Sequence, residues 1–177
     1  MSKALIVIDM QNDFVDGALG SAEAQAIVPN VVEKVRTWDK EDLLYFTRDT
    51  HFYDYMNSLE GHYLPIPHCM KETAGWCLIN ELAPYAFGDD GADGVFDKNT
   101  FGYKSWPNVL TLTYADEIHL CGLCTDICVV SNALVLRMLF PQKKIVVDAS
   151  CCAGVTPEKH KAALEVMKSC QIEVINE

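Results

Sequence analysis

Short apolar runs alternate along the chain with segments whose apolar residues recur at helical spacing. Because apolar runs bounded by polar or turn residues are typical of strands buried on both faces, we predict strands over residues 3–10, 43–47, 95–97, 115–121, 144–149 and 172–175. The helical spacing predicts helices over residues 22–40, 75–86, 108–112 and 157–169, and one that follows Gly122. Strands that alternate with helices predict right-handed βαβ units. The expected fold is therefore α/β: a three-layer, doubly wound, mainly parallel six-stranded sheet with helices on both faces.

One long segment breaks this alternation. Residues 52–74 show little periodicity and contain Pro65 and Pro67. A long stretch without regular structure inside a compact domain is commonly functional. We therefore expect an excursion that covers or lines a site.

Length and charge limit the functions that need to be considered. The 177 residues fit one domain, 1–177, which is large enough to bury about 70% of its unfolded surface. The formal net charge is −11 and no run of Lys or Arg is present, so nucleic acid and anionic membrane would be repelled. We expect a small-molecule partner, with no nucleic acid and no membrane.

The apolar run nearest the N-terminus, residues 4–8, is too short for a signal peptide or a membrane span. We therefore expect a cytoplasmic protein. The eight cysteines lie within ordinary core-like segments, which argues against a disulfide framework. Reduced thiols are expected.

Chemically active residues follow the predicted strands. Asp9, Asp49 with His51, Lys98 and Cys128 all come just after a strand. In open parallel sheets, ligands bind outside the carboxyl ends of the strands, where the strand order reverses. The fold alone would gather these residues along one edge.

Cys128 lies where a strand passes through a tight turn into a helix. Gly122 ends the strand, and Thr125 and Asp126 are residue types that cap helix N-termini. Cys128 would then lie in or just before the first helical turn, where free N–H groups and the helix dipole favour a thiolate. A small buried packing residue is the alternative interpretation.

A cysteine nucleophile needs a proton acceptor and a group that holds charge. Asp9 can accept the thiol proton and return it to a leaving amine, and the ammonium of Lys98 would lower the pKa of Cys128. Singly, Asp9 could be a turn residue and Lys98 a solvated one. Their joint position at strand ends favours a catalytic site.

A second set of residues is suited to a metal. Asp49 and His51, with His68 or His62 further on, offer one carboxylate and imidazoles, which suit Zn²⁺, Mn²⁺ or Fe²⁺ with positions left open. The sequence alone does not choose between the two later histidines. A hydrogen-bonded polar cluster at a strand end is the alternative.

Over nearly its full length the chain resembles the nicotinamidase/isochorismatase-like cysteine hydrolases. The matching segments are residues 4–14, 47–51, 67–69 with Gly75, 96–98 and 122–129. The resemblance implies that Asp9, Lys98 and Cys128 form the catalytic triad. It implies that Asp49, His51 and His68 hold a divalent metal, most naturally zinc, with His62 as second choice.

The resemblance also implies an activity. The family cleaves small carboxamides to an acid and ammonia through a cysteine thioester. A cis peptide bond is implied at Leu123–Cys124, with the N–H groups of Cys124 and Cys128 directed at an oxyanion. Family members are often dimers or larger, so we expect a homo-oligomer.

The sequence departs from the nicotinamidase pattern at two positions. Pro65 stands where these enzymes usually carry an aromatic residue that stacks on the pyridine ring, and position 124 is Cys instead of a small residue without a thiol. Phe14, Tyr103 and Trp106 could rebuild an aromatic wall. The substrate could instead be another small amide, a carbamoyl compound or a vinyl ether.

Two interpretations from other classes remain. Cys121-x-x-Cys124 and the pair Cys151-Cys152 could belong to a thiol redox or metal-binding protein, although the spacing completes no zinc site. An inactive scaffold that serves as a binding module is the other, and the intact triad argues against it.

Overall fold

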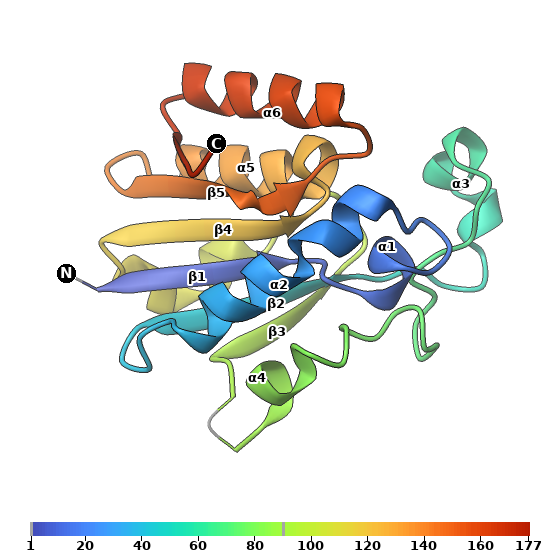
Figure 1. Ribbon diagram of the computed structural model, residues 1–177, viewed down its shortest axis with the longest axis horizontal. Coiled ribbons are helices and arrows are strands. Elements are labelled where there is room, and N and C mark those ends of the chain that lie inside the picture. The colour runs from blue at the N-terminus through green and yellow to red at the C-terminus, as the bar shows by residue number, and fades with distance from the viewer. Residues whose placement is uncertain (1, 90) are drawn as a thin grey trace.

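The computed structural model describes residues 2–89 and 91–177, and in this part of the chain six parallel strands form one sheet (Figure 1). The strand order is β3-β2-β1-β4-β5-β6. The strands are β1 (Lys3–Ile8), β2 (Leu43–Asp49), β3 (Gly94–Lys98), β4 (Glu117–Leu123), β5 (Lys144–Ala153) and β6 (Glu173–Ile175). The parallel sheet with helices between its strands confirms the predicted α/β fold.

Helices connect these strands. The α-helices are α1 (Asn12–Val15), α2 (Ala22–Arg36), α3 (Leu59–Tyr63), α4 (Ala83–Phe87), α5 (Val130–Leu139) and α6 (Pro157–Ser169). Shorter 3₁₀ turns span Tyr55–Asn57, Trp106–Asn108 and Leu110–Thr113, and a π-helical turn spans Thr125–Val129.

The strand order reverses between β1 and β4. From β1 the chain proceeds to β2 and β3 on one side, and from β4 to β5 and β6 on the other. Because parallel crossovers are right-handed, this reversal puts the connecting helices on opposite faces. Figure 1 shows α2 in front of the strands, and α5 and α6 pack against each other and against β5.

The centre of the core is β1. It pairs with β2 on one side and β4 on the other, and its residues 4–8 are all fully buried. Each buried Leu, Ile or Val side chain contributes about 1.5–3 kcal/mol relative to an exposed one. A continuous apolar run is therefore the pattern that this position in the sheet requires.

Local signals explain where the two longest helices begin. Ser21 caps α2 by accepting a hydrogen bond from the N–H of Ala24 at 3.0 Å, and Thr156 caps α6 by accepting from Lys159 N–H at 3.2 Å. Pro157 occupies the first position of α6, where no N–H is needed. Helix α6 has the bounds that the sequence predicted.

The prediction of a helix over residues 75–86 is wrong except at the C-terminal end of that range, because only Ala83–Phe87 is helical. The carbonyls of Gly75 and Cys77 accept hydrogen bonds from Asp13 and Asn12, each at 3.0 Å. These long-range bonds hold the segment against the stretch after β1. Tertiary contacts therefore override its helical spacing.

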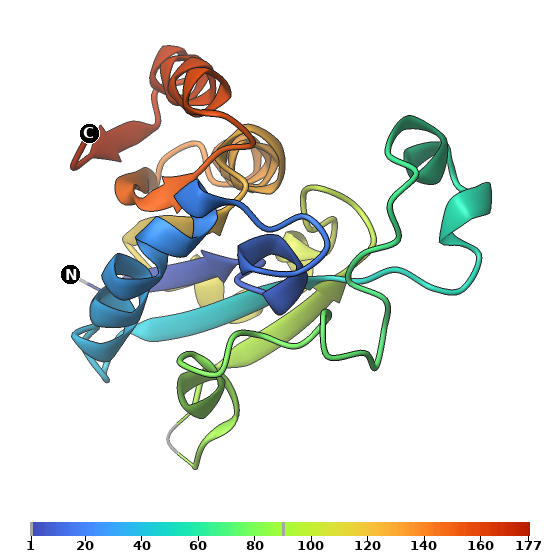
Figure 2. The same ribbon diagram turned by 45° about the vertical axis from the view of Figure 1, so that its right-hand side comes forward.

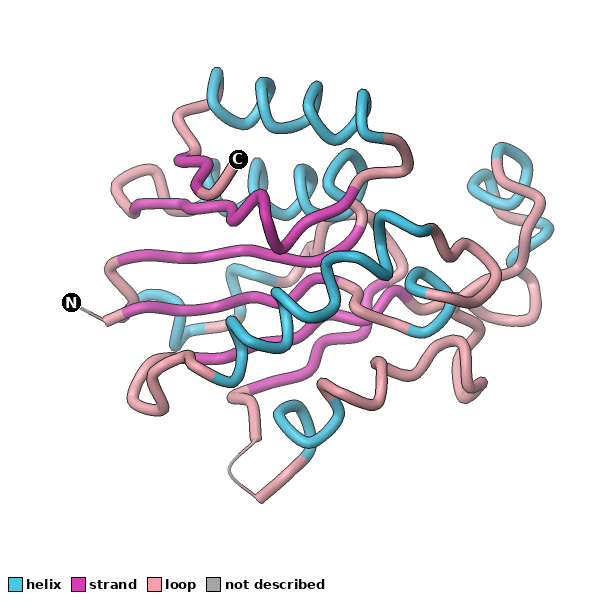
Figure 3. Tube along the Cα trace, viewed as in Figure 1, coloured by secondary structure: helices cyan, strands magenta, loops and turns pink. Residues whose placement is uncertain are grey.

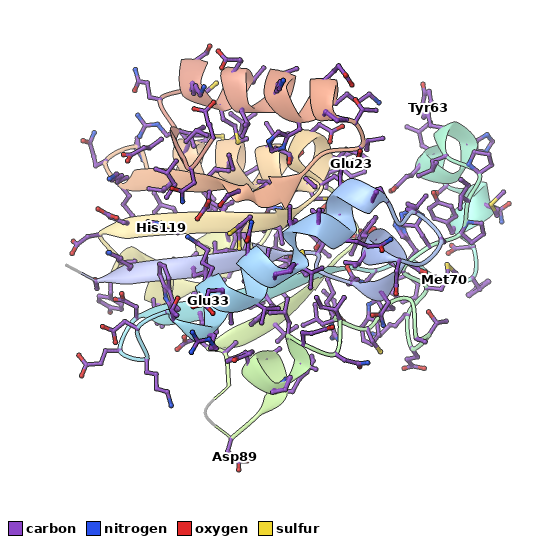
Figure 4. The ribbon with its side chains drawn as sticks, viewed as in Figure 1. Glu23, Glu33, Tyr63, Met70, Asp89 and His119 are labelled. Atoms are coloured by element: carbon purple, nitrogen blue, oxygen red, sulfur yellow. The ribbon has the colours of Figure 1, made fainter. Side chains whose placement is uncertain are left out.

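The excursion after β2 lies at the carboxyl end of the sheet, together with α1 (Figure 2). It is mostly loop, with α3 as its main helix (Figure 3). Tyr63 at the end of α3 points away from the body of the protein and is 85% exposed (Figure 4). The excursion is thus in the position expected of a segment that covers a site.

Among the residues that the structure describes, no helix is both long enough and apolar enough to cross a membrane.

Candidate active site

Three buried side chains from different elements meet at the carboxyl end of the sheet. Nζ of Lys98, the last residue of β3, lies 2.6 Å from Oδ2 of Asp9 and 3.5 Å from Sγ of Cys128. Asp9 follows β1, and Cys128 lies in the π-helical turn after β4. The long side chain of Lys98 reaches past β2 to join them. The structure therefore brings together the three residues that the sequence named as a candidate triad.

An unusual backbone conformation directs Asp9 into this cluster. Its φ is 47°, in the left-handed region, which Asp tolerates better than most residues. The hydroxyl of Thr47, which is fully buried, donates to Oδ1 of Asp9 at 2.7 Å. Oδ1 is thereby occupied, and Oδ2 is left for Lys98 and the thiol.

The protonation states follow from burial and the neighbouring charges. Burial works against a charged Lys98, but Asp9 and Cys128 raise its pKa above the usual value. Burial raises the pKa of Asp9, and Lys98 opposes that shift. Burial also raises the pKa of Cys128 well above that of a free thiol, although the Lys98 ammonium lowers it. The net direction of these shifts favours the thiol form of Cys128, whereas the sequence argument favoured a thiolate.

The turn that carries Cys128 is held differently from what the sequence predicted. Thr125 and Asp126 do not cap a helix. Oγ1 of Thr125 pairs with Nδ1 of His160 in α6 at 2.8 Å, and Oδ1 of Asp126 accepts from Val155 N–H at 2.9 Å. Because Thr125 bonds to α6 and Asp126 to the segment that leads into α6, these side chains anchor the turn to that part of the chain and do not satisfy its first N–H groups.

The residues just before this turn require an unusual backbone. Gly122 has a φ of 116°, and a Cβ there would collide with the carbonyl oxygen of Ile8. The Leu123–Cys124 peptide bond is cis, as the family resemblance implied. Burial, helped by Asp126 and Asp9, raises the pKa of Cys124 to about 12. Cys124 is therefore also a protonated thiol.

Four potential metal ligands lie beside the Asp9–Lys98–Cys128 cluster. Their ligand atoms, from Asp49, His51, Glu60 and His68, all lie within 4.8 Å of one another. Nε2 of His51 is 2.8 Å from Oδ2 of Asp49 and 3.7 Å from Oε1 of Glu60. Nε2 of His68 is 3.5 Å and 3.8 Å from the same two oxygens.

This arrangement fits a divalent ion. Metal–ligand bonds of about 2.0–2.3 Å place neighbouring ligand atoms roughly 3–4 Å apart, close to the spacings found here. Nδ1 of His68 lies 2.8 Å from the carbonyl of Ile66, which as an acceptor fixes the proton on Nδ1 and leaves Nε2 free for a metal. Burial opposes ionisation of Asp49, but hydrogen bonds from His51 and His68 hold its pKa below the usual value. Two imidazoles and an ionised carboxylate are typical ligands of zinc, manganese or iron.

The sequence did not indicate Glu60 as a metal ligand, and the structure places His62 outside the ligand group. Glu60 lies in α3 and turns its carboxylate toward the histidines, whereas His62 on the same short helix is exposed and outside the ligand group. A carboxylate within the predicted covering segment was the signal available for Glu60. Without the path of the excursion, nothing distinguished it from other acidic residues.

Gln11 is a second missed residue, and it joins the two clusters. Its Oε1 accepts from Asp49 N–H at 2.7 Å, and its Nε2 donates to the carbonyls of Asp49 at 2.9 Å and Trp76 at 2.8 Å. Gln11 is fully buried two residues after Asp9. It therefore fixes the metal-type cluster relative to the segment that carries Asp9. Nζ of Lys98 is 3.8 Å from Oδ1 of Asp49, so the clusters are in contact.

The three aromatic residues proposed for the pocket wall occupy two places. The Phe14 ring lies 5.6 Å from that of His68, beside the metal-type cluster. Tyr103 stacks on Phe96 at 5.1 Å with an interplanar angle of 22°, and Trp106 packs edge-on against it. Trp106 is fully buried, so it supports Tyr103 from behind and does not present its own face.

A further aromatic residue, Tyr55, lies near the position of Pro65. Its ring centroid is 4.7 Å from that of His51 and 5.2 Å from that of His68. Its hydroxyl donates to the carbonyl of Leu64 at 2.7 Å, which holds the stretch before His68 in place. Burial raises the pKa of Tyr55 to about 12, so the hydroxyl keeps its proton.

Comparisons with known proteins show which family this chain is similar to. The isochorismatase domain family model matches residues 3–177. The nicotinamidase/pyrazinamidase of Mycobacterium tuberculosis is 29% identical, over 98% of this chain and 98% of that protein.

Solved structures of nicotinamidases and pyrazinamidases are also similar to this chain. A crystal structure of nicotinamidase/pyrazinamidase PncA from Bacillus subtilis matches with a TM-score of 0.88 and 30% identity, over 99% of this chain and 100% of that one. The pyrazinamidase of Pyrococcus horikoshii in complex with zinc matches with a TM-score of 0.83 and 28% identity, over the full length of both chains. The resemblance stated from the sequence is confirmed, and the chain belongs to the isochorismatase family.

Proposed function

We propose that this isochorismatase-family enzyme is a metal-assisted cysteine amidase that hydrolyses a small carboxamide to its acid and ammonia, as nicotinamidases do. The observation that carries the proposal is the contact of Lys98 with both Asp9 and Cys128 in a buried cluster. This cluster supplies a nucleophile, a proton acceptor and a fixed cation. The names of the similar proteins support the same activity.

The first half of the reaction forms a thioester. Asp9 takes the thiol proton of Cys128, and Sγ attacks the carboxamide carbon while the carbonyl electron pair moves onto oxygen. The N–H groups of Cys124 and Cys128 are the proposed donors to that oxyanion. The C–N bond then breaks, and Asp9 returns the proton to the leaving amine, so that ammonia departs.

The second half releases the acid. Asp9, again a carboxylate, takes a proton from water, and the resulting hydroxide attacks the thioester carbon. Collapse of this intermediate breaks the C–S bond, and the proton that Asp9 took from water passes to Sγ, which restores the thiol of Cys128. The raised pKa of Asp9 makes it a better base than an exposed carboxylate. Lys98 remains an ammonium and offsets negative charge in both halves.

Asp49, His51, Glu60 and His68 would hold the divalent ion, for which we propose zinc, with manganese and iron as alternatives. The ion would supply a Lewis-acidic anchor that orients the substrate. Phe14 beside His68, and Tyr103 with its support from Trp106, form the proposed aromatic walls. Pro65 leaves no stacking residue at the usual position. Tyr55 contacts both histidines and the carbonyl of Leu64, the residue before Pro65.

Ammonia release tests the proposal. Purified protein would be assayed with nicotinamide, pyrazinamide, benzamide, an aliphatic amide, a carbamoyl amino acid and a vinyl ether. We expect ammonia from the aromatic carboxamides, and none from the same amides with Cys128→Ala protein. If every amide is inert while the vinyl ether is cleaved, the amidase assignment is wrong.

The homo-oligomer and the cytoplasmic location expected from the sequence stay predictions. Light scattering of the purified protein and fractionation of cells would test them.

A further inference from the structure

A fully buried amide side chain connects the nucleophile to the aromatic wall. Asn132 lies in α5, four residues after Cys128, and has no exposed surface. Its Oδ1 accepts from Tyr103 N–H at 2.9 Å and from Trp106 Nε1–H at 2.8 Å. Its Nδ2 donates to the carbonyls of Cys128 at 2.8 Å and Phe101 at 3.2 Å.

These four partners fix the orientation of the amide. Two of them, the Tyr103 amide and the Trp106 indole N–H, can only donate, and two are carbonyls that can only accept. A flipped amide would put each group against a like partner. Every hydrogen-bonding position of Asn132 is therefore used, and none is left to adapt.

The segment joined to α5 in this way is the one that follows Lys98. It carries Tyr103 and Trp106, and it approaches the helix closely at Gly102, where a Cβ would meet the carbonyl of Ser131 at 3.3 Å. Asn132 thus connects the backbone of the nucleophile residue to the loop that continues from Lys98 and to both aromatic residues.

We infer that Asn132 is a positioning residue that sets the distance between Cys128 and the wall at Tyr103, and so favours flat aromatic carboxamides over aliphatic amides. This inference rests on the proposed amidase function. Asn132 bonds the main-chain carbonyl of Cys128, not its sulfur, so it acts through that residue. An error of about 1 Å in such a placement can cost on the order of 100-fold in rate.

Two substitutions that keep the branched shape of the side chain separate its two roles. Asn132→Asp keeps an oxygen for Tyr103 and Trp106 but replaces the donor to Cys128 and Phe101 with a second oxygen. Asn132→Leu removes all four hydrogen bonds. Leu136→Ala is the control, because Leu136 is a fully buried residue one turn further along α5 and destabilises the core without touching this network.

We expect Asn132→Asp to lower kcat for nicotinamide about 10–100-fold with KM within roughly three-fold of wild type, because the wall stays while the nucleophile shifts. Asn132→Leu should also raise KM and lower the ratio of kcat/KM for nicotinamide to kcat/KM for an aliphatic amide. The fluorescence that Trp106 contributes, obtained by subtracting the spectrum of the matching Trp106→Phe protein, should change in Asn132→Leu and persist in Asn132→Asp. Leu136→Ala should lower the melting temperature and leave these quantities unchanged.

The inference is overturned if both Asn132 proteins keep kcat and the aromatic-to-aliphatic ratio within about two-fold of wild type, or if Leu136→Ala changes them equally. If the Asn132 proteins do not fold, Trp106→Phe is used instead, because it removes one donor to Oδ1 and keeps an aromatic ring at this position. An unchanged substrate ratio in that protein overturns the inference as well.

Wild-type protein that releases no ammonia from any amide would contradict the proposed function instead. Alkylation of Cys128 and the emission of Trp106 would then test the positioning role without turnover.

Discussion

The ammonium of Lys98 lies against the carboxylate of Asp9, with Nζ 2.6 Å from Oδ2, and both side chains are buried. Each charge offsets the cost of removing the other from water. Removing one partner of such a pair leaves an uncompensated buried charge, which typically costs about 3–5 kcal/mol. The pair therefore affects both the stability of the fold and the acidity of the nearby thiol.

Replacing Lys98 with Met should slow alkylation of Cys128. Burial already raises the pKa of this thiol, and Lys98 is the group that opposes the rise. Without the cation the thiolate fraction near neutral pH falls, and with it the rate of reaction with iodoacetamide. Peptide mass spectrometry would follow Cys128, with the exposed Cys77 and Cys170 as internal references. Equal rates in both proteins would exclude a role for Lys98 in the acidity of Cys128.

Cys128→Ala should abolish turnover and leave the fold intact, because it removes the nucleophile but little volume. Cys124→Ala should retain measurable activity, since the Cys124 thiol is protonated and only its backbone N–H is assigned a role. Ammonia release and circular dichroism would be measured on both proteins. Complete loss in both would indicate a cysteine pair instead of a single nucleophile.

Glu60→Gln and His68→Ala should lower the metal content, whereas His62→Ala should not. Glu60 and His68 belong to the ligand group, and His62 on the same excursion is exposed and outside it. Elemental analysis after dialysis should find about one ion per wild-type chain. Metal retained in full by both ligand variants would mean that these residues form only a polar cluster.

Chelation provides a second test of the metal. Removing the ion should raise KM or lower kcat for a pyridine carboxamide, while Cys128 should still react with iodoacetamide. A preparation that is free of metal and fully active would contradict the assisting role.

Asp148→Asn should destabilise the protein at neutral pH but not at low pH. Burial opposes ionisation of Asp148, but hydrogen bonds from Lys34, Ser150 and Asn176 hold its pKa below the usual value. Since the folded pKa is the lower one, this stabilisation is complete above the unfolded pKa of about 3.9 and is lost as pH falls through the folded pKa.

Urea unfolding at pH 7 and pH 3 would measure the effect. We expect a loss of about 1–3 kcal/mol at pH 7, in line with hydrogen bonds to charged groups, and a smaller difference at pH 3. Glu33→Gln is the control, because Glu33 forms an exposed ion pair with Arg36 and should matter little. An Asp148→Asn penalty that does not depend on pH would refute the assignment.

The sequence by itself determined the fold class and named most residues of the candidate site. Buried apolar runs such as residues 4–8 require a strand covered on both faces, and strands alternating with helices leave few arrangements other than a parallel sheet. Because such sheets gather their strand ends, Asp9, Lys98 and Cys128 could be placed together before any coordinates. The motifs around them were specific enough to name the family.

Only the tertiary structure decided the remaining features, since these depend on contacts between distant segments. Residues 75–86 have helical spacing, but hydrogen bonds from Asp13 and Asn12 to the carbonyls of Gly75 and Cys77 hold the start of this segment against the stretch after β1. Glu60 joins His51 and His68 because the excursion folds back over the sheet edge. The raised pKa of Cys128 comes from burial, which local sequence does not reveal. A pattern of residue types determines the strands and the long helices, whereas the fate of a short helical pattern, the path of a loop and the burial of one thiol depend on the packing of the whole chain.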